Sequence, residues 1–148
     1  MAMEKMNILF VCVHNSARSQ MAEAFLKQIG AEKFIAESAG LEPGILNPLV
    51  VEVMQEIGID ISGNKTSGAF DLFKQGKMYN FVITVCDAAN AERCPVFPGV
   101  SKKISWSFED PSSFTGTHEE KIAKTRVVRD KIKNEVEKFV KEYHNVNF

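Results

Sequence analysis

Apolar residues gather in short runs that predict strands, and the stretches between these runs carry apolar residues at helical spacing. The run over residues 6–13 is nearly continuous, as expected for a parallel strand that is buried on both faces. Shorter β-rich runs predict strands at 33–38, 80–85 and, more weakly, 102–106. The pattern therefore predicts four strands.

Apolar residues three or four positions apart predict helices in the intervening stretches. One helix is expected over 17–29, a short one over 69–74, and the longest over about 118–143. Another begins at Asn47-Pro48, because Asn suits a helix cap and Pro suits the first turn. The apolar face of that helix is expected to consist of Val50, Val53, Met54 and Ile57.

Strands that alternate with helices are typical of α/β proteins. We expect a single three-layer domain over residues 1–148, with a four-stranded parallel sheet flanked by helices on both faces. A chain of 148 residues that is 45% hydrophobic can build a core without disulfides or metals. Ligands of such sheets bind beyond the carboxyl ends of the strands.

Charge and hydropathy exclude several classes of partner. The net charge of -1 predicts no binding to nucleic acid or to an anionic membrane. The first apolar run ends at His14, too early for a signal peptide, and no apolar stretch is long enough to span a bilayer. We therefore expect a cytoplasmic protein, where thiols stay reduced and three cysteines indicate chemistry rather than structural disulfides.

A cysteine, an arginine and a serine share the loop between the first predicted strand and the first predicted helix. Arg18 stands six residues after Cys12 and is followed by Ser19. Backbone N–H groups and the dipole at the start of a helix favour an anion in such a loop. The same field favours a thiolate, and a planar guanidinium suits tetrahedral oxyanions. Cys12 is therefore predicted to be a nucleophile rather than an inert buried thiol.

A candidate general acid follows the last predicted strand. The segment 106–111 ends in Glu109-Asp110-Pro111, at the sheet end where Cys12 is expected. Asp110 is the candidate proton donor for a departing oxygen, and Glu109 is interpreted as a solvated neighbour. An ordinary Asx-Pro turn is the alternative for Asp110.

Two further cysteines, Cys86 and Cys94, bracket a short polar segment. They can pair in a disulfide if the segment brings their Cα atoms to roughly 4.4–6.8 Å. Two buried, unreactive thiols are the alternative. A metal site is not expected, because the cysteine spacing does not fit one and the three histidines are scattered.

Together these residues make the chain resemble the low-molecular-weight protein tyrosine phosphatase superfamily, and specifically its thioredoxin-coupled arsenate reductase branch. Residues 12–19 resemble the anion loop, 106–111 the acid loop, and Cys86 with Cys94 the redox pair that ordinary phosphatases of this fold lack. Such phosphatases usually carry aromatic residues just after Asp-Pro, whereas two serines follow here. A small inorganic anion therefore fits this resemblance better than an aryl phosphate.

The resemblance implies a relay of three thiols that uses no metal and no cofactor. Cys12 attacks arsenate, and Asp110 protonates the departing oxygen. Cys86 then attacks Cys12 and releases arsenite, and Cys94 attacks Cys86. Thioredoxin reduces the resulting disulfide, and Ser19 stabilises the Cys12 thiolate. The implied substrate-binding residues are Val13, His14, Asn15, Ser16, Ala17, Arg18 and Ser19.

Asn15 is expected to hold the loop, because asparagine tolerates a left-handed backbone. Some members of the resembled family also bind potassium near the loop through an Asn, a Glu, a Ser and an Asp. Asn15, Glu23 and Ser38 match that pattern, but Gly68 stands where the aspartate would align. We therefore expect weak or absent potassium dependence.

Two other functions fit parts of the pattern. A phosphatase acting on phosphotyrosine or a small phosphate ester needs only Cys12, Arg18 and Asp110, and leaves Cys86 and Cys94 as protection against oxidation. A redox sensor would pass its disulfide state to a partner, but it leaves Asp110 and Arg18 without a task. For the reductase, the thiol donor is thioredoxin or glutaredoxin, and a monomer is expected.

Overall fold

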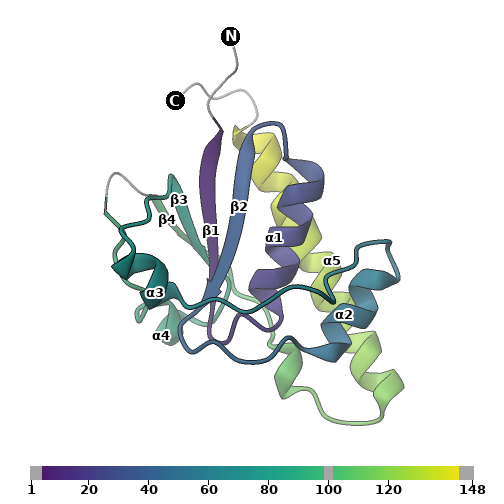
Figure 1. Cartoon of the computed structure of the whole chain (residues 1–148). Coiled ribbons are helices and arrows are strands. Elements are labelled where there is room, and N and C mark those ends of the chain that lie inside the picture. Colours follow the sequence, from purple (N-terminus) through teal and green to yellow (C-terminus); the bar gives the residue numbers. More distant parts are fainter. Residues whose placement is uncertain (1–4, 99–101, 144–148) are drawn as a thin grey trace.

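The structure, a computed structural model, describes residues 5–98 and 102–143. Four parallel strands form one sheet in the order β2-β1-β3-β4 (Figure 1). The predicted α/β class and parallel sheet are therefore confirmed. The strands are β1 (Met6–Cys12), β2 (Phe34–Gly40), β3 (Phe81–Thr84) and β4 (Lys102–Ser105).

Helices flank the sheet on both faces, as predicted. Figure 1 shows α1 and α5 side by side on one side of the sheet, α2 against α5, and α3 on the opposite side. The helices are α1 (Arg18–Ile29), α2 (Pro48–Gln55), α3 (Ala69–Lys74), α4 (Ala88–Ala91) and α5 (His118–Tyr143), with a 3-10 turn η1 at Pro111–Ser113. None of the helices in the described part of the chain is long and apolar enough to cross a membrane.

Strand β1 lies at the centre of the fold because both of its faces are apolar. Ile8, Phe10 and Cys12 belong to the core that packs under α1, α2 and α5. Leu9 and Val11 point to the other face, which is covered by α3 and by residues 94–97 rather than by a long helix. This alternation places the Cys12 side chain on the helical face, at the last position of the strand.

Helix α2 ends earlier than its apolar pattern predicted. The helix stops at Gln55, and Ile57 is 38% exposed in the following turn instead of lying on the apolar face. The reason is Gly58, whose positive φ of 79° reverses the chain while the N–H of Ile59 donates to the carbonyl of Met54 at 3.0 Å. Such a left-handed glycine is a common helix stop.

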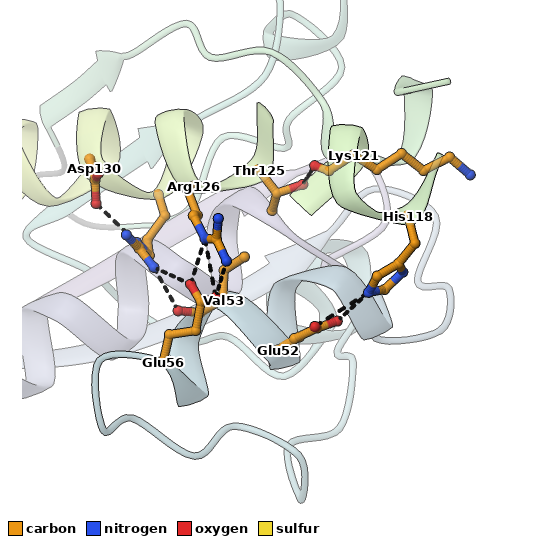
Figure 2. Close-up of polar contacts among 9 residues, drawn as sticks. Glu52, Val53, Glu56, His118, Lys121, Thr125, Arg126 and Asp130 are labelled. Carbon is orange, nitrogen blue, oxygen red and sulfur yellow. Dashed lines mark hydrogen bonds and ion pairs between the residues drawn. The ribbon is translucent and has the colours of Figure 1, made fainter. Parts of the chain in front are cut away.

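Charged side chains join α2 to α5 (Figure 2). Arg129 is mostly buried, and its Nη1 donates to the carbonyl of Val53 at 2.9 Å and to Oε1 of Glu56 at 3.0 Å. Arg126 donates through Nε to the same oxygen at 2.9 Å. Because Val53 lies in the last turn of α2, a cation there also complements the negative end of the helix dipole. We call Glu56, Arg126 and Arg129 the α2–α5 clamp.

The polar segment between Cys86 and Cys94 contains a helix that the sequence pattern did not predict. The side chain of Asp87 begins α4 by accepting the N–H of Asn90 at 2.8 Å. Four residues are too few to show a helical period in the sequence. The two cysteines are therefore separated by an ordered turn.

Candidate active site

The chain leaves β1 at Cys12 and turns through residues 13–17 into α1. The Cys12 thiol is buried, with 2% exposure, and two groups contact its sulfur. Ser19 Oγ lies 2.8 Å from Sγ, and the backbone N–H of Asn15 donates to Sγ at 3.2 Å. Hydrogen bonds of this kind are strongest when the acceptor carries negative charge, so the surroundings of Cys12 suit a thiolate nucleophile.

Asn15 organises the loop through both its backbone and its amide. Its φ of 55° confirms the expected left-handed conformation. Its Nδ2 donates to Ser19 Oγ at 2.8 Å and to Ser38 Oγ at 2.9 Å, and its Oδ1 accepts the N–H of Ser67 at 2.9 Å. Because an amide nitrogen only donates, the hydroxyl hydrogen of Ser19 remains available for the Cys12 sulfur.

Gly40, at the end of β2, makes room for this loop. A Cβ at this position would lie 2.7 Å from the backbone N of Asn15 and 2.9 Å from the carbonyl oxygen of Val13. Both neighbours are backbone atoms, which move only with the whole loop. A glycine is therefore required where β2 passes the anion loop.

The hydrogen bonds continue from Asn15 away from the thiol. Ser38 Oγ donates to Glu23 Oε1 at 2.6 Å, and the ammonium of Lys27 lies 2.7 Å from Glu23 Oε2. Both carboxylate oxygens of Glu23 are thus already hydrogen-bonded, and Lys27 supplies the positive charge beside them. Gly68 itself brings no carboxylate, although Oδ2 of Asp71 lies 2.7 Å from where a Cβ at this position would be. Weak or absent potassium dependence stays a prediction.

Arg18 begins α1 and lies between the anion loop and the loop that follows β4. Its Nη1 donates to the carbonyl of Phe108 at 3.2 Å, and its Nη2 lies 3.5 Å from Asp110 Oδ2. Its Nε is buried and has no hydrogen-bond partner among the described residues. Ala17, the residue before the helix, provides no side-chain cap. Unsatisfied donors at a helix start suit a bound oxyanion.

Asp110 forms the Asx turn that the sequence left open as one alternative, and its carboxylate also faces Arg18. Its Oδ1 accepts the N–H of Ser112 at 2.9 Å, as in an Asx turn, while Oδ2 faces Arg18. The side chain is 33% exposed, so a proton can reach it from solvent. Its role as a proton donor stays a prediction. Glu109 is exposed, as expected of a solvated neighbour.

Cys86 follows β3, the strand beside β1, and its thiol is buried. Burial raises the pKa of this thiol, while the positive charge of Arg18 acts in the opposite direction. Cys12 also acts on the pKa of Cys86 and raises it. Cys86 is therefore a second thiol whose pKa depends on residues of the anion loop.

Cys94 lies beyond α4 in the core of the opposite sheet face, with Leu9 and Val11. It is 7% exposed, and burial raises its pKa to about 11. All three cysteines are free thiols. Cys94 thus packs in a different core cluster from Cys12 and Cys86.

The other predicted loop residues contribute in different ways. Val13 is partly buried against the core, Ser16 and Ala17 are buried, and His14 is exposed. The His14 ring bonds the carbonyl of Glu42 at 2.8 Å, and the Ser16 carbonyl accepts the N–H of Asn47. Their binding of substrate stays a prediction. The residues described by the structure include no group of three His, Cys, Asp or Glu side chains that could hold a metal.

Several supporting residues were missed in the sequence. Gln20 and Ser67 both donate to Asn15 Oδ1, and Gly40 gives the loop its space. Ser67 comes from a segment with no motif of its own, so no local signal reveals it. Gln20 directly follows the loop of residues 12–19, and that position is the one signal that could have found it. Gly40 offered one signal, a glycine at the end of a predicted strand, which often marks a close approach of backbones.

The fold and the Cys-to-Arg loop define a class of protein. Residues 7–146 match the low molecular weight phosphotyrosine protein phosphatase family, and the chain belongs to that family. An arsenate reductase of Oceanobacillus iheyensis is 42% identical over 139 residues, which cover 94% of this chain and 98% of that protein.

Solved structures agree with this assignment. An arsenate reductase in the oxidized state superposes with a TM-score of 0.77 at 31% identity, covering 93% of this chain and 98% of that one. A thioredoxin-dependent arsenate reductase of Corynebacterium glutamicum superposes with a TM-score of 0.69 at 25% identity, covering 97% of this chain and 64% of that one.

Proposed function

We propose that this protein reduces arsenate to arsenite, with its own thiols as the source of electrons. The observation that carries the proposal is the position of Cys86, a second buried thiol that follows β3 where β3 pairs with the end of β1, next to Cys12. A phosphatase of this fold needs one thiol beside its anion loop, whereas a reduction needs two. The similarity to arsenate reductases supports the same function.

Arsenate binds first in the loop of residues 12–18. Its oxygens accept hydrogen bonds from Arg18, including the buried Nε, and from the N–H groups at the start of α1. The Cys12 thiolate then attacks arsenic, and Asp110 protonates the departing oxygen, which leaves as water. A bond between sulfur and arsenic(V) results.

Cys86 takes the second step. It loses its proton to solvent and attacks Cys12 Sγ, forming a disulfide. The sulfur–arsenic bond breaks with its electron pair on arsenic, so arsenic(V) becomes arsenic(III) and leaves as arsenite. Two thiols are oxidised and one arsenic is reduced by two electrons, which balances the step.

Cys94 completes the relay by attacking Cys86, which releases Cys12 as a thiolate. That thiolate regains its hydrogen bonds from Ser19 and from the Asn15 N–H. The Cys86–Cys94 disulfide then passes to an external dithiol. We propose thioredoxin as this reductant, in line with the thioredoxin-dependent relative, and glutaredoxin is the competing donor.

We further propose that residues 1–148 form one domain that acts as a monomer in the cytoplasm. Three free cysteines support a reducing compartment. The net charge of -1 supports the expectation of no nucleic-acid or anionic-membrane partner.

Hydrolysis of phosphate esters is the second candidate activity. Cys12, Arg18 and Asp110 are sufficient for it, and a cavity of about 330 Å³ beside the acid loop offers space for an organic group. Its lining includes Ile45, Pro111 and Phe114. We expect this activity as a residual one, since phosphate and arsenate are both tetrahedral oxyanions.

The discriminating variant is Cys94→Ser. We expect it to lose repeated arsenate turnover, measured as NADPH oxidation with thioredoxin and thioredoxin reductase, because the relay stops at the Cys12–Cys86 disulfide. Hydrolysis of p-nitrophenyl phosphate should remain within about twofold of the unmodified protein, since it requires no thiol exchange. Equal loss of both activities would contradict the three-thiol relay. No arsenate turnover by the unmodified protein would favour the phosphatase.

A further inference from the structure

The surroundings of Cys94 conflict with its part in the relay. Only a thiolate attacks a disulfide, yet Cys94 is buried among Leu9, Val11 and Phe97. Burial raises its pKa to about 11, so few molecules carry the thiolate at neutral pH. A nearby cation would offset this burial.

Lys103 of β4 supplies such a cation. Its Nζ donates to the carbonyl oxygen of Ala91, the last residue of α4, at 2.9 Å. The backbone N–H of Cys94 donates to the same oxygen at 3.3 Å. One carbonyl therefore ties the ammonium of Lys103 and the backbone of Cys94 together.

The other charged groups near this segment have different partners. Arg93 binds Glu42 at 2.8 Å, and Asp87 accepts hydrogen bonds from Asn90. Among the described residues that act on the pKa of Cys94, Lys103 lowers it and the Cys86 thiol raises it. Tyr79, in the same core, donates its hydroxyl to Glu37.

We propose that Lys103 is a positioning residue for the last thiol exchange. Its ammonium holds the Ala91 carbonyl that also binds the Cys94 N–H, and its charge favours the Cys94 thiolate. The proposal rests on the three-thiol relay proposed above. In this step Cys94 gives its proton to solvent and its Sγ bonds to Cys86 Sγ. The Cys12–Cys86 bond breaks, and its electron pair leaves on Cys12, so no further oxidant is required.

Three variants separate charge from structure. Lys103→Met removes the charge and keeps most of the stem, Lys103→Arg keeps the charge, and Lys102→Met is the control on the neighbouring residue, whose Nζ bonds the Tyr143 hydroxyl instead. Each is made in the full chain with Cys12→Ser and Cys86→Ser, so that Cys94 is the remaining thiol. The measurement is the rate of Cys94 alkylation by iodoacetamide between pH 6 and about pH 11. This range spans the ordinary and the raised pKa values of cysteine thiols.

We expect Lys103→Met to shift the alkylation profile to higher pH and to slow the reaction at pH 7.5 by about fivefold, because a nearby positive charge is lost. Lys103→Arg should restore most of the rate, and Lys102→Met should match the parent. In urea, all four proteins should react alike. An unchanged alkylation profile in Lys103→Met would overturn the proposal. An equal shift in Lys103→Met and Lys103→Arg would also overturn it, and so would an equal shift in Lys103→Met and Lys102→Met.

The same substitutions in the three-cysteine protein test the step itself. Arsenate turnover with thioredoxin should fall in Lys103→Met and recover in Lys103→Arg, with the loss largest at low pH. An undiminished turnover in Lys103→Met at pH 6.5 would overturn the proposal. The alkylation assay uses neither arsenate nor thioredoxin, so a failure of the proposed reductase function is distinguishable from a failure of the Lys103 proposal.

Discussion

At the scale of single residues, the site depends on hydrogen bonds whose direction is fixed by chemistry. The amide of Asn15 donates to Ser19 and to Ser38, so each serine keeps its own hydrogen for another acceptor. Ser38 gives its hydrogen to Glu23, and Ser19 gives its hydrogen to the Cys12 sulfur. The Cys12 sulfur therefore lies among an ordered set of hydrogen-bond donors.

Replacement of Gly40 by alanine tests how tightly this loop is packed. Because the added methyl would meet backbone atoms of Asn15 and Val13, we expect Gly40→Ala to reduce the free energy of unfolding by about 1–3 kcal/mol, as overpacking does. It should also weaken the binding of phosphate. Denaturant unfolding and a phosphate titration measure the two effects.

Gly63→Ala is the matched control, since a Cβ there has no heavy atom within 4 Å. Its free energy of unfolding should lie within about 0.5 kcal/mol of the unmodified protein. A Gly40→Ala protein as stable as this control would contradict the argument.

Site residues that lie close together in the sequence were easier to predict than those that come together only in the fold. Cys12, Arg18 and Ser19 were recognisable because one short loop holds them. Ser67 was not, because it reaches Asn15 from 52 residues away in a segment without a motif. Lys103 was missed for the same reason: its contact with α4 arises only when β4 pairs with β3.

At the scale of elements, the α2–α5 clamp connects the outer helices to the site. Helix α2 begins at Asn47, whose N–H donates to the carbonyl of Ser16 and whose amide donates to Ser112 at 3.2 Å. The other end of α2 is held by Arg126 and Arg129 through Glu56. The clamp therefore holds one end of a helix whose cap residue, Asn47, contacts both the anion loop and η1.

The clamp should be sensitive to acid. Hydrogen bonds and charge from Arg126, and from Arg129, lower the pKa of Glu56 from its ordinary 4.5. A group with a lowered pKa in the folded state stabilises the protein above its ordinary pKa, and this stabilisation is lost as the pH falls further. Glu56→Gln should thus lower the thermal midpoint at pH 7, and the difference from the unmodified protein should shrink below about pH 4.5.

Thermal unfolding from pH 7 to about pH 3 checks this expectation. Glu135→Gln serves as the control, because Glu135 forms an exposed pair with Lys138 at 3.8 Å, and such pairs contribute little. A Glu56→Gln deficit that is independent of pH would indicate lost packing instead of lost charge.

Some helices and strands were easier to predict from the sequence than others. β1 was predictable from its nearly continuous apolar run, and α1 and α5 from apolar residues at helical spacing. The predicted end of α2 was wrong by two residues, because Ile57 fits the apolar period while Gly58 stops the helix. Helix α4 has too few residues to show a helical period, and at its start the Asp87 carboxylate accepts hydrogen bonds from Asn90.

At the scale of the whole molecule, sheet order determines which residues can react together. β1 and β3 are neighbours and parallel, so Cys12 and Cys86 follow the same edge of the sheet although 74 positions in the sequence separate them. β4 brings Asp110 to that edge from the other side of β3. The alternation of strands and helices predicted this shared edge, and the pairing of the strands established it.

A bound oxyanion should stabilise the whole fold, because only the folded chain assembles the site. Phosphate at a hundred times its dissociation constant should add about 2.7 kcal/mol to the free energy of unfolding. Thermal midpoints with sodium phosphate and with sodium chloride at equal ionic strength measure the effect. Arg18→Lys should lose most of the increase, because an ammonium cannot replace the planar guanidinium. An equal increase in both proteins would mean that phosphate binds elsewhere.

The outermost position of β4 has a consequence for solubility. An edge strand exposes unpaired backbone groups that invite pairing with a strand of another molecule. In β4, two adjacent lysines occupy this edge, and lysines on edge strands oppose such pairing. We therefore expect the positive charges of Lys102 and Lys103 to disfavour association of β4 with a strand of another molecule.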